Sequence, residues 1–200
     1  KYHYEYRKAF EEIYNTLREQ NVDYIVHTGD LAHTKTQLSP EYFELATDFL
    51  KNLADIAETH LILGNHDGNL RNASRQDAIT PIVEALNHPS LILHKYSGEV
   101  QLEDDLTLNV LSIFDETNWQ DPTDPKAINI ALYHGAINNS QTDLGWVMDH
   151  GDHDIKVFDK FDYAMLGDIH KTNQVLNESG TIRYCGSTIQ QNHGETNDKG

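Results

Sequence analysis

Apolar positions recur along the chain with a helical period in the first half and mostly with a strand period in the second. Three segments carry apolar or aromatic residues at helical spacing, namely residues 4–20, 39–57 and 74–86. Short apolar runs typical of buried strands lie between them, at 22–26 and 61–63. Further strand patterns lie at 90–94, 100–102, 106–114, 128–133, 163–166, 174–176 and 182–184. This order predicts an α/β fold with mixed sheets that carry helices outside.

The helix at 39–57 has the clearest start signal, because Ser39 suits an N-cap, Pro40 the first helical position and Glu41 the acidic first turn. Pro81 is expected to kink or split the helix at 74–86. Leu, Ile, Val and Phe make up about a quarter of the 200 residues, which is enough for a packed core. No repeat, low-complexity block or linker interrupts the pattern, so we expect one domain over residues 1–200.

Charge, hydropathy and cysteine content argue against several classes of protein. The chain carries 15 Lys and Arg against 32 Asp and Glu, a net charge of −17, which argues against binding nucleic acid by charge alone. No apolar run approaches the roughly 20 residues that cross a bilayer, so no membrane association is expected. The single cysteine, Cys185, excludes an internal disulfide framework and is expected to lie buried in a strand. With no signal peptide visible, we expect an intracellular protein, cytoplasmic or nucleoid-associated and not secreted.

The candidate chemistry lies where predicted strands end. Four strands run directly into short polar clusters, namely Gly29–His33, Gly64–Asp67, His134–Gly135 and Gly167–His170. Ligands gather at the carboxyl ends of strands in sheets of this kind. Each cluster alone is typical of a turn or a helix cap. Four of them in one chain with 12 histidines predict a site for Mn²⁺, Mg²⁺, Fe²⁺ or Zn²⁺, which bind carboxylate, amide and imidazole groups.

These four clusters resemble, in order and context, the motifs of the calcineurin-like metallophosphoesterases. Three further details resemble the SbcD-like nucleases, a double-strand-break repair family within them. They are Gly-Asp-Leu-Ala-His at 29–33, Phe-Asp-Tyr at 161–163 ahead of the cluster ending at Lys171, and Tyr-x-Gly-Ser-Thr at 184–188 followed by Gly194-Glu195. The resemblance implies a metallophosphoesterase sandwich of two mixed β-sheets flanked by helices, in four layers and one domain.

The resemblance also implies two divalent metal ions, Mn²⁺ first among the alternatives. Asp30 would bridge both ions, and a set of three ligands would complete one of them: Asn65, His134 and Asp168. His170 would belong to the other ion. Two such ions about 3.5–4 Å apart would turn a shared water into hydroxide near neutral pH, and the hydroxide would attack phosphorus in line.

Four further residues would act on the substrate. His66 would contact the scissile phosphate or protonate the leaving oxygen, and His33 would place substrate near the metals. Arg71 and Lys171 are near the motifs in sequence and are candidates for contacts to the substrate's phosphate backbone.

The chain departs from the family pattern in two places. It lacks the Asp-x-His motif of the family's first strand, so we expect an excerpt without that strand and without a C-terminal capping domain, in which the second metal binds weakly. Asp168 stands where the family usually has His. A carboxylate there favours Mn²⁺ or Mg²⁺ over Zn²⁺ if Asp168 is a ligand. The alternative is that Asp168 only hydrogen-bonds a ligand histidine.

The leading hypothesis for function is a Mn²⁺-dependent DNA exonuclease and endonuclease in DNA end processing. Its partners would be duplex ends or hairpins and a coiled-coil SbcC-like ATPase, and a homodimer is compatible with the resemblance. One alternative is a small-molecule phosphodiesterase acting on cyclic nucleotides. Another is a non-catalytic scaffold that kept the fold and lost a metal.

Overall fold

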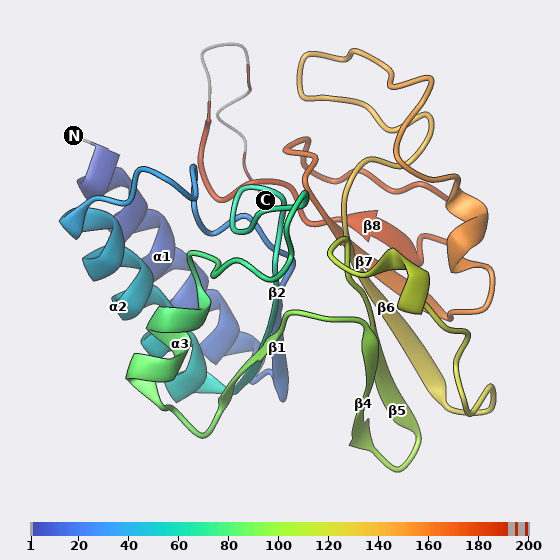
Figure 1. The fold of residues 1–200 in the computed structure, drawn as a ribbon, viewed down its shortest axis with the longest axis horizontal. Coiled ribbons are helices and arrows are strands. Elements are labelled where there is room, and N and C mark those ends of the chain that lie inside the picture. The colour runs from blue at the N-terminus through green and yellow to red at the C-terminus, as the bar shows by residue number, and fades with distance from the viewer. Residues whose placement is uncertain (1, 192–194, 196–198, 200) are drawn as a thin grey trace. The chain divides into compact units, whose positions relative to one another are not determined.

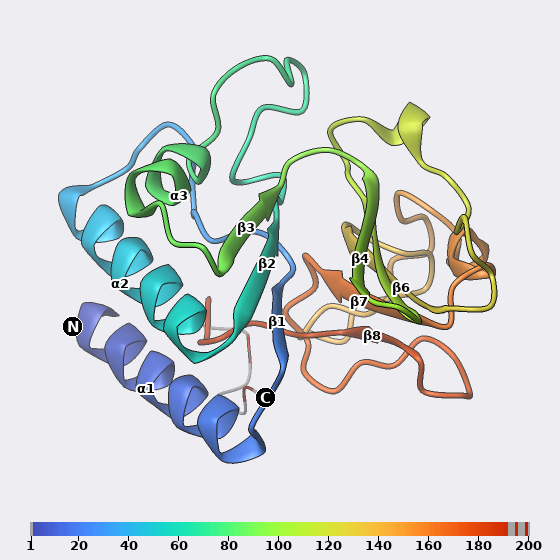
Figure 2. The same ribbon diagram turned by 90° about the horizontal axis from the view of Figure 1, so that it is seen from below.

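Two β-sheets, one in each half of the chain, organise the structure, a computed structural model that describes residues 2–191, Glu195 and Lys199. Residues 1–94 form an N-terminal unit and residues 95–200 a C-terminal unit. Figures 1 and 2 show helices, together with a parallel sheet, in the N-terminal unit and a larger sheet in the C-terminal unit. The predicted α/β class with two sheets is confirmed.

The N-terminal unit has three parallel strands in the order β1-β2-β3. Their bounds are Tyr24–His27 for β1, Glu58–Ile62 for β2 and Leu91–His94 for β3. The helices are α1 (Tyr2–Gln20), α2 (Pro40–Ile56) and α3 (Thr80–Leu86). Figures 1 and 2 both show the three helices on the same face of this sheet. Strands β1 and β2 begin or end within three residues of the predicted positions.

Helix α2 forms as its start signal predicts. The Ser39 hydroxyl accepts a hydrogen bond from the Tyr42 N–H (3.1 Å), and Pro40 occupies the first turn. One stripe of the helix is buried, consisting of Ala46, Phe49, Leu50, Leu53 and Ala54. The Phe49 ring stacks on Phe10 of α1 at a centroid distance of 4.2 Å, so the two helices share one apolar contact surface.

The C-terminal unit has a mixed sheet in the order β4-β5-β6-β7-β8. Its strands are β4 (Gly98–Glu103), β5 (Leu106–Leu111), β6 (Ile128–His134), β7 (Tyr163–Gly167) and β8 (Ile182–Tyr184). Strands β4 and β5 pair antiparallel, whereas each later pair is parallel. Two short 3₁₀ helices, η1 (Glu116–Asn118) and η2 (Ile155–Phe158), lie in the connections. The core of this unit includes Tyr133, Ile137, Phe158, Leu166 and Tyr184, each nearly fully buried.

The predicted helix at 74–86 is wrong in its first half. The chain is irregular up to Ile79, and Pro81 lies in the first turn of α3, where it starts the helix and does not kink it. The physical reason is Asp77, whose buried carboxylate accepts hydrogen bonds from Ile79 N (2.8 Å), Thr80 N (2.6 Å) and the Thr80 hydroxyl (2.7 Å). These bonds cap the N-terminus of α3 and favour a turn over an earlier helix.

Three other expectations are corrected. Strand β5 ends at Leu111, because the Ser112 hydroxyl bonds the Lys95 carbonyl (2.8 Å) and turns the chain out of the sheet. Residues 174–176 form only an isolated bridge, between Val175 and Arg183. Cys185 follows the end of β8 and is exposed instead of buried. Among the described residues, no helix is long and apolar enough to cross a membrane.

A pair of histidines, the buried His60 and the half-buried His94, connects β2 and β3. Nδ1 of His60 and Nε2 of His94 are 2.8 Å apart, and Nε2 of His60 is 2.8 Å from the Glu58 carboxylate. Burial, reinforced by the charge of His60, lowers the pKa of His94 to about 4. An unfolded histidine has a pKa near 6.5. The pair therefore stabilises the fold above pH 6.5, and this contribution is lost as pH falls towards 4.

Between pH 7.5 and pH 5, the free energy of unfolding of the parent chain should fall by about 2 kcal/mol more than that of His94→Gln. The reason is that glutamine keeps a polar group beside His60 and does not titrate. The measurement is the free energy of unfolding in urea at both pH values. The matched control is His150→Gln, at an exposed loop position, which should behave like the parent chain. Equal pH dependence in parent and His94→Gln would contradict the assignment.

Candidate metal and phosphate site

The turn that follows β1 places Asp30 in a strained conformation. Gly29 and Asp30 both have positive φ angles, of 95° and 59°. In the described part of the chain, the non-glycine residues with positive φ are four asparagines, Asp30 and Asp168. Asparagine tolerates this region best, and strain at other residues gathers at functional sites. The backbone is therefore strained at two of the predicted metal ligands.

The buried carboxylate of Asp67 ties the end of β1 to the end of β2. Oδ2 accepts hydrogen bonds from Asp30 N (2.7 Å) and Gly64 N (2.8 Å), and Oδ1 accepts one from Ala32 N (2.9 Å). The residue is fully buried. Burial raises the pKa of Asp67 to about 6, although the three backbone bonds favour the charged form. Asp67 thus holds in place the two loops that carry Asp30 and Asn65.

The same two loops hold the predicted catalytic histidines. The backbone N–H of His66 donates to Asp30 Oδ1 (3.0 Å), and Nδ1 of His66 lies 2.7 Å from the His33 carbonyl oxygen. Because a carbonyl only accepts, Nδ1 of His66 carries a proton, and Nε2 is the ring nitrogen that this contact leaves for another group. The His33 and His66 rings stack at 6.1 Å, and both residues are exposed.

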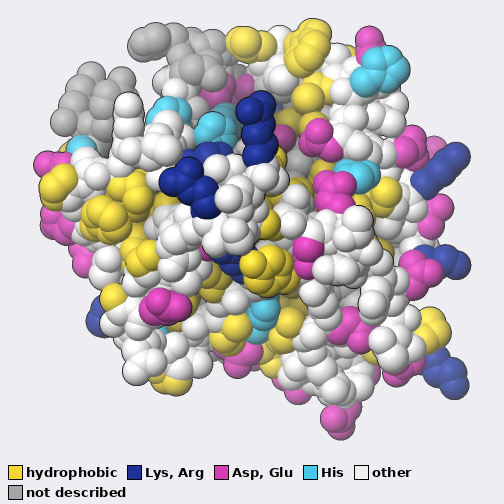
Figure 3. All heavy atoms as spheres, in the orientation of Figure 1, with side chains coloured by type: hydrophobic (Ala, Val, Ile, Leu, Met, Phe, Trp, Pro, Cys, Tyr) yellow, Lys and Arg dark blue, Asp and Glu magenta, His cyan; other side chains and the backbone are white. Residues whose placement is uncertain are grey.

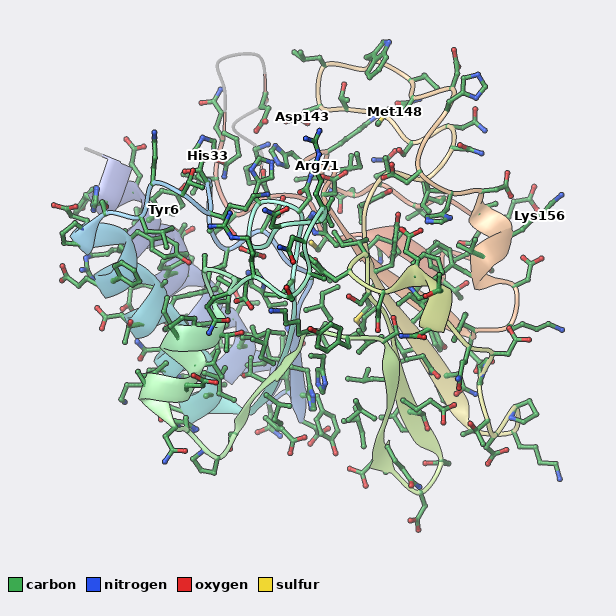
Figure 4. All side chains as sticks on the ribbon, in the orientation of Figure 1. Tyr6, His33, Arg71, Asp143, Met148 and Lys156 are labelled. Carbon is green, nitrogen blue, oxygen red and sulfur yellow. The ribbon has the colours of Figure 1, made fainter. Side chains whose placement is uncertain are left out.

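Two basic residues lie on these loops. Lys35 donates to the carbonyls of Asn65 (3.1 Å) and Gly68 (2.7 Å), so its charge supports the turn at the end of β2. Arg71, a predicted substrate contact, is exposed on the loop after Gly68, and Figure 4 labels it together with His33. The N-terminal unit therefore brings together Asp30, Asn65, His33 and His66, with Arg71 on the same loop as Asn65 and His66.

In the C-terminal unit, the ends of two adjacent parallel strands bring His134 and Asp168 together. His134 pairs with Gly167 in the β6–β7 register, so Asp168 follows directly beside it. Nε2 of His134 lies 3.7 Å from Asp168 Oδ1, and the His134 side chain is 1% exposed. This distance exceeds a hydrogen bond and is close to the separation of two ligands on one ion with bonds of about 2.1 Å. The donor pair therefore fits a divalent cation.

Tight packing fixes the turn after His134. A Cβ atom on Gly135 would collide with the hydroxyl group of the buried Tyr133 side chain, so only glycine fits there. The Tyr184 hydroxyl donates to the Gly135 carbonyl (2.8 Å) and accepts from Ile137 N (3.0 Å). Tyr184 is nearly fully buried, and burial raises its pKa well above the usual value. It therefore stays a neutral donor that holds the backbone beside His134.

His170 and Lys171 follow Asp168 and each has a polar partner. Nδ1 of His170 lies 2.8 Å from Glu195 Oε1, and Glu195 is buried. Lys171 donates to the Gln141 side-chain oxygen, so this predicted substrate contact is half-buried and anchored. Gly194, part of the resemblance, lies outside the described residues.

The motifs named in the sequence contain three supporting residues whose roles the sequence did not predict: Asp67, Glu195 and Tyr184. Asp67 stands inside the Gly-Asn-His-Asp motif, so the motif itself contained the signal. The partner of His170 is 25 residues away in the sequence, and no spacing pattern connects the two. Tyr184 is part of the Tyr-x-Gly-Ser segment, but its bonds to residues 135 and 137 depend on strand pairing.

Comparison with known proteins gives two findings. Residues 3–172 match the calcineurin-like phosphoesterases, so the match runs through both units. An uncharacterized protein of Acanthamoeba polyphaga mimivirus is 39% identical over 208 aligned residues. The alignment covers 97% of this chain and 15% of that protein, so the chain spans a small part of the relative's length.

We expect Asp67→Asn to destabilise the fold by about 1–3 kcal/mol, because an amide has one acceptor oxygen and must turn its NH₂ group towards a buried backbone N–H. Because its pKa is raised, Asp67 stabilises the fold more at low pH than at high pH. Its contribution is complete below pH 3.8 and is lost as pH rises through about 6.

The stability gap between parent and Asp67→Asn should therefore be about 1 kcal/mol larger at pH 5 than at pH 7.5. Urea unfolding at the two pH values measures it. Asp23→Asn, at an exposed position in the same unit, is the control and should leave the gap near zero. A difference in unfolding free energy that is smaller at pH 5 than at pH 7.5 would argue against burial as the main cause of the pKa of Asp67.

Proposed function

The chain belongs to the calcineurin-like phosphoesterase family of metal-dependent hydrolases, and on that premise we propose that it cleaves phosphodiester bonds in DNA. The proposed metal ligands are Asp30, Asn65, His134, Asp168 and His170. The observation that carries the proposal is the spacing of 3.7 Å between buried His134 and Asp168, which suits two ligands of one ion better than a hydrogen bond. This spacing favours Asp168 as a ligand over its alternative role as a hydrogen-bond partner.

The residues of the chain then have distinct tasks. Divalent ions held by these ligands would supply a water of lowered pKa and positive charge beside the phosphoryl oxygens. The Nδ1 proton of His66 is committed to the His33 carbonyl, so a hydrogen bond donated to the phosphate, or a proton delivered to the leaving oxygen, must come from the Nε2–H of a doubly protonated ring. The hydrogen bond from the His66 backbone N–H to the Asp30 carboxylate keeps this imidazole beside a carboxylate that would bind the ions.

Within the family, the SbcD-like nucleases are the proposed relatives. The motifs at 29–33, 161–171 and 184–188 support this assignment, and the bonds of Tyr184 give its motif a physical role in holding the turn after His134. Acidic side chains are interspersed with basic ones on the face drawn in Figure 3, in keeping with the net charge of −17. We therefore propose that DNA binding relies on local contacts such as Arg71 and on a coiled-coil ATPase partner.

A cavity in the C-terminal unit favours the small-molecule phosphodiesterase as the second candidate. It has a volume of about 390 Å³ and includes Lys171 in its lining. The remaining lining is mostly amide side chains, from Asn138, Asn139, Gln141, Asn173 and Gln174. One cation among amide groups suits a small phosphoester, and Lys171 directly follows the proposed metal ligand His170 in the sequence.

The first test is Mn²⁺-dependent shortening of an end-labelled linear DNA duplex by the natural full-length protein. We expect His66→Asn to lower the cleavage rate by about 10²–10⁴, because asparagine cannot transfer a proton. His150→Asn, at an exposed loop position, is the matched control and should cleave like the parent. A cyclic nucleotide is included in a parallel reaction.

Each outcome assigns a function. Mn²⁺-dependent shortening that is lost in His66→Asn supports the nuclease. Intact DNA with a hydrolysed cyclic nucleotide supports the second candidate and rejects the nuclease. If neither substrate is hydrolysed, with or without the ATPase partner, both candidate functions are rejected and the non-catalytic scaffold remains.

We expect Asp168→His to raise the affinity for Zn²⁺ relative to Mn²⁺ by roughly tenfold, because imidazole replaces a hard oxygen ligand. Competitive titration of the two metals measures the ratio. Asp105→His, at an exposed turn, controls for the added histidine and should leave the ratio unchanged. An unchanged ratio in Asp168→His would mean that Asp168 is not a ligand.

A further inference from the structure

We propose that Glu195 is a positioning residue that fixes His170 in the tautomer whose Nε2 binds a metal ion, and that Lys199 and Asp143 hold Glu195 in place. The inference rests on the proposed function in one respect, the assignment of His170 as a metal ligand. The contacts themselves lie within the C-terminal unit.

The tautomer follows from the contact between His170 and Glu195. Nδ1 of His170 and Oε1 of Glu195 are 2.8 Å apart. An ionised carboxylate only accepts hydrogen bonds, so Nδ1 must carry the proton. In the neutral ring this leaves the lone pair on Nε2, the form that binds metals. Carboxylate partners of this kind commonly orient metal-binding histidines.

Glu195 is itself held at both ends. Its second oxygen, Oε2, accepts from Gln191 N (2.9 Å) and Lys199 Nζ (3.0 Å), and its backbone carbonyl accepts from the Gln190 side chain (2.8 Å). The Gln191 N–H and the Lys199 ammonium group both donate to the Glu195 carboxylate, which suits its ionised, acceptor-only form.

Lys199 joins Glu195 to a second carboxylate. Its Nζ lies 2.8 Å from Asp143 Oδ2, and the side chains of Lys199, Asp143 and Glu195 are 6%, 7% and 3% exposed. Charges this well buried stabilise a structure only as a complete set, because one removed partner leaves another unpaired. The order Asp143, Lys199, Glu195, His170 thus forms one connected network that ends on the predicted metal ligand.

The far end of the network stands on a hairpin. Residues 141–147 form it through the Gln141–Val147 bridge and the bond from Thr142 N to the Trp146 carbonyl (2.9 Å). Asp143 and Met148, labelled in Figure 4, lie on this segment and just after it. Gln141 at its base also accepts the bond from Lys171. The hairpin is therefore tied to both His170 and Lys171, which gives it a fixed position beside the proposed site.

The substitution Glu195→Gln makes a specific tautomer prediction. Two donors, Gln191 N and Lys199 Nζ, face the position of Oε2, so the amide oxygen of the new glutamine should take that place. Its NH₂ group then faces His170 Nδ1, which must become an acceptor and lose its proton to Nε2. The substitution preserves shape and inverts the tautomer.

The experiment is ¹⁵N NMR of the histidine rings in the metal-free protein, with the His170 signals assigned through His170→Gln. The parent should show a protonated Nδ1, and Glu195→Gln should show a protonated Nε2. Glu178→Gln, at an exposed position, is the matched control and should leave the parent tautomer. A parent ring with its proton on Nε2, or an unchanged ring in Glu195→Gln, would overturn the proposal.

A Mn²⁺ titration then connects tautomer to metal. We expect Glu195→Gln to lower the affinity about 10- to 100-fold, and Glu178→Gln to leave it unchanged. Unchanged affinity despite an inverted tautomer would also overturn the proposal. Because neither measurement uses a phosphoester, a failure of the nuclease assay with a confirmed tautomer would reject the proposed function and leave the role of Glu195 standing.

Discussion

The buried carboxylate of Asp67 is the constraint on which the N-terminal part of the candidate site depends. Three backbone N–H groups, from two loops more than thirty residues apart, converge on its two oxygens. Burying this charge is destabilising, and burial accordingly raises the pKa of Asp67 to about 6. The hydrogen bonds of the same carboxylate hold the loops that carry Asp30 and His66 in one arrangement. The strained φ of Asp30 persists because these bonds determine it.

The C-terminal unit also holds its predicted ligands in fixed positions, but through strand register and a tyrosine hydrogen bond. There the register of β6 and β7 sets His134 beside Asp168, and the Tyr184 hydroxyl fixes the turn that follows His134. His170 depends on a carboxylate from a segment near the end of the chain. In both units the predicted ligands stand on strand ends, and side chains with no predicted metal role decide their orientation. That division between ligand and support is common in metal sites.

The sequence predicted the local elements well and the long-range support poorly. Helix α2 followed from Ser39 and Pro40, and the strand ends followed from apolar runs that stop at Gly or His. The segment at 74–79 was wrongly predicted as helix. The Asp77 carboxylate accepts hydrogen bonds from Ile79 N and Thr80 N, so the helix starts only at Thr80 despite the helical spacing of apolar residues before it. The bond between Glu195 and His170 joins distant residues, so only the fold brings them together. Cys185 is exposed because it directly follows the buried Tyr184, and successive side chains of an extended segment point to opposite faces.

The central claim is that Asp30, Asn65, His134, Asp168 and His170 hold divalent metal ions. The most direct measurement is anomalous X-ray diffraction from crystals of the protein grown with Mn²⁺. The account predicts an anomalous peak within about 2.3 Å of both His134 Nε2 and an Asp168 oxygen, and Mn²⁺ contacts at His170 Nε2 and at an Asp30 oxygen. Ordered Mn²⁺ found only on other acidic side chains, with these five residues in no contact with it, would contradict the account.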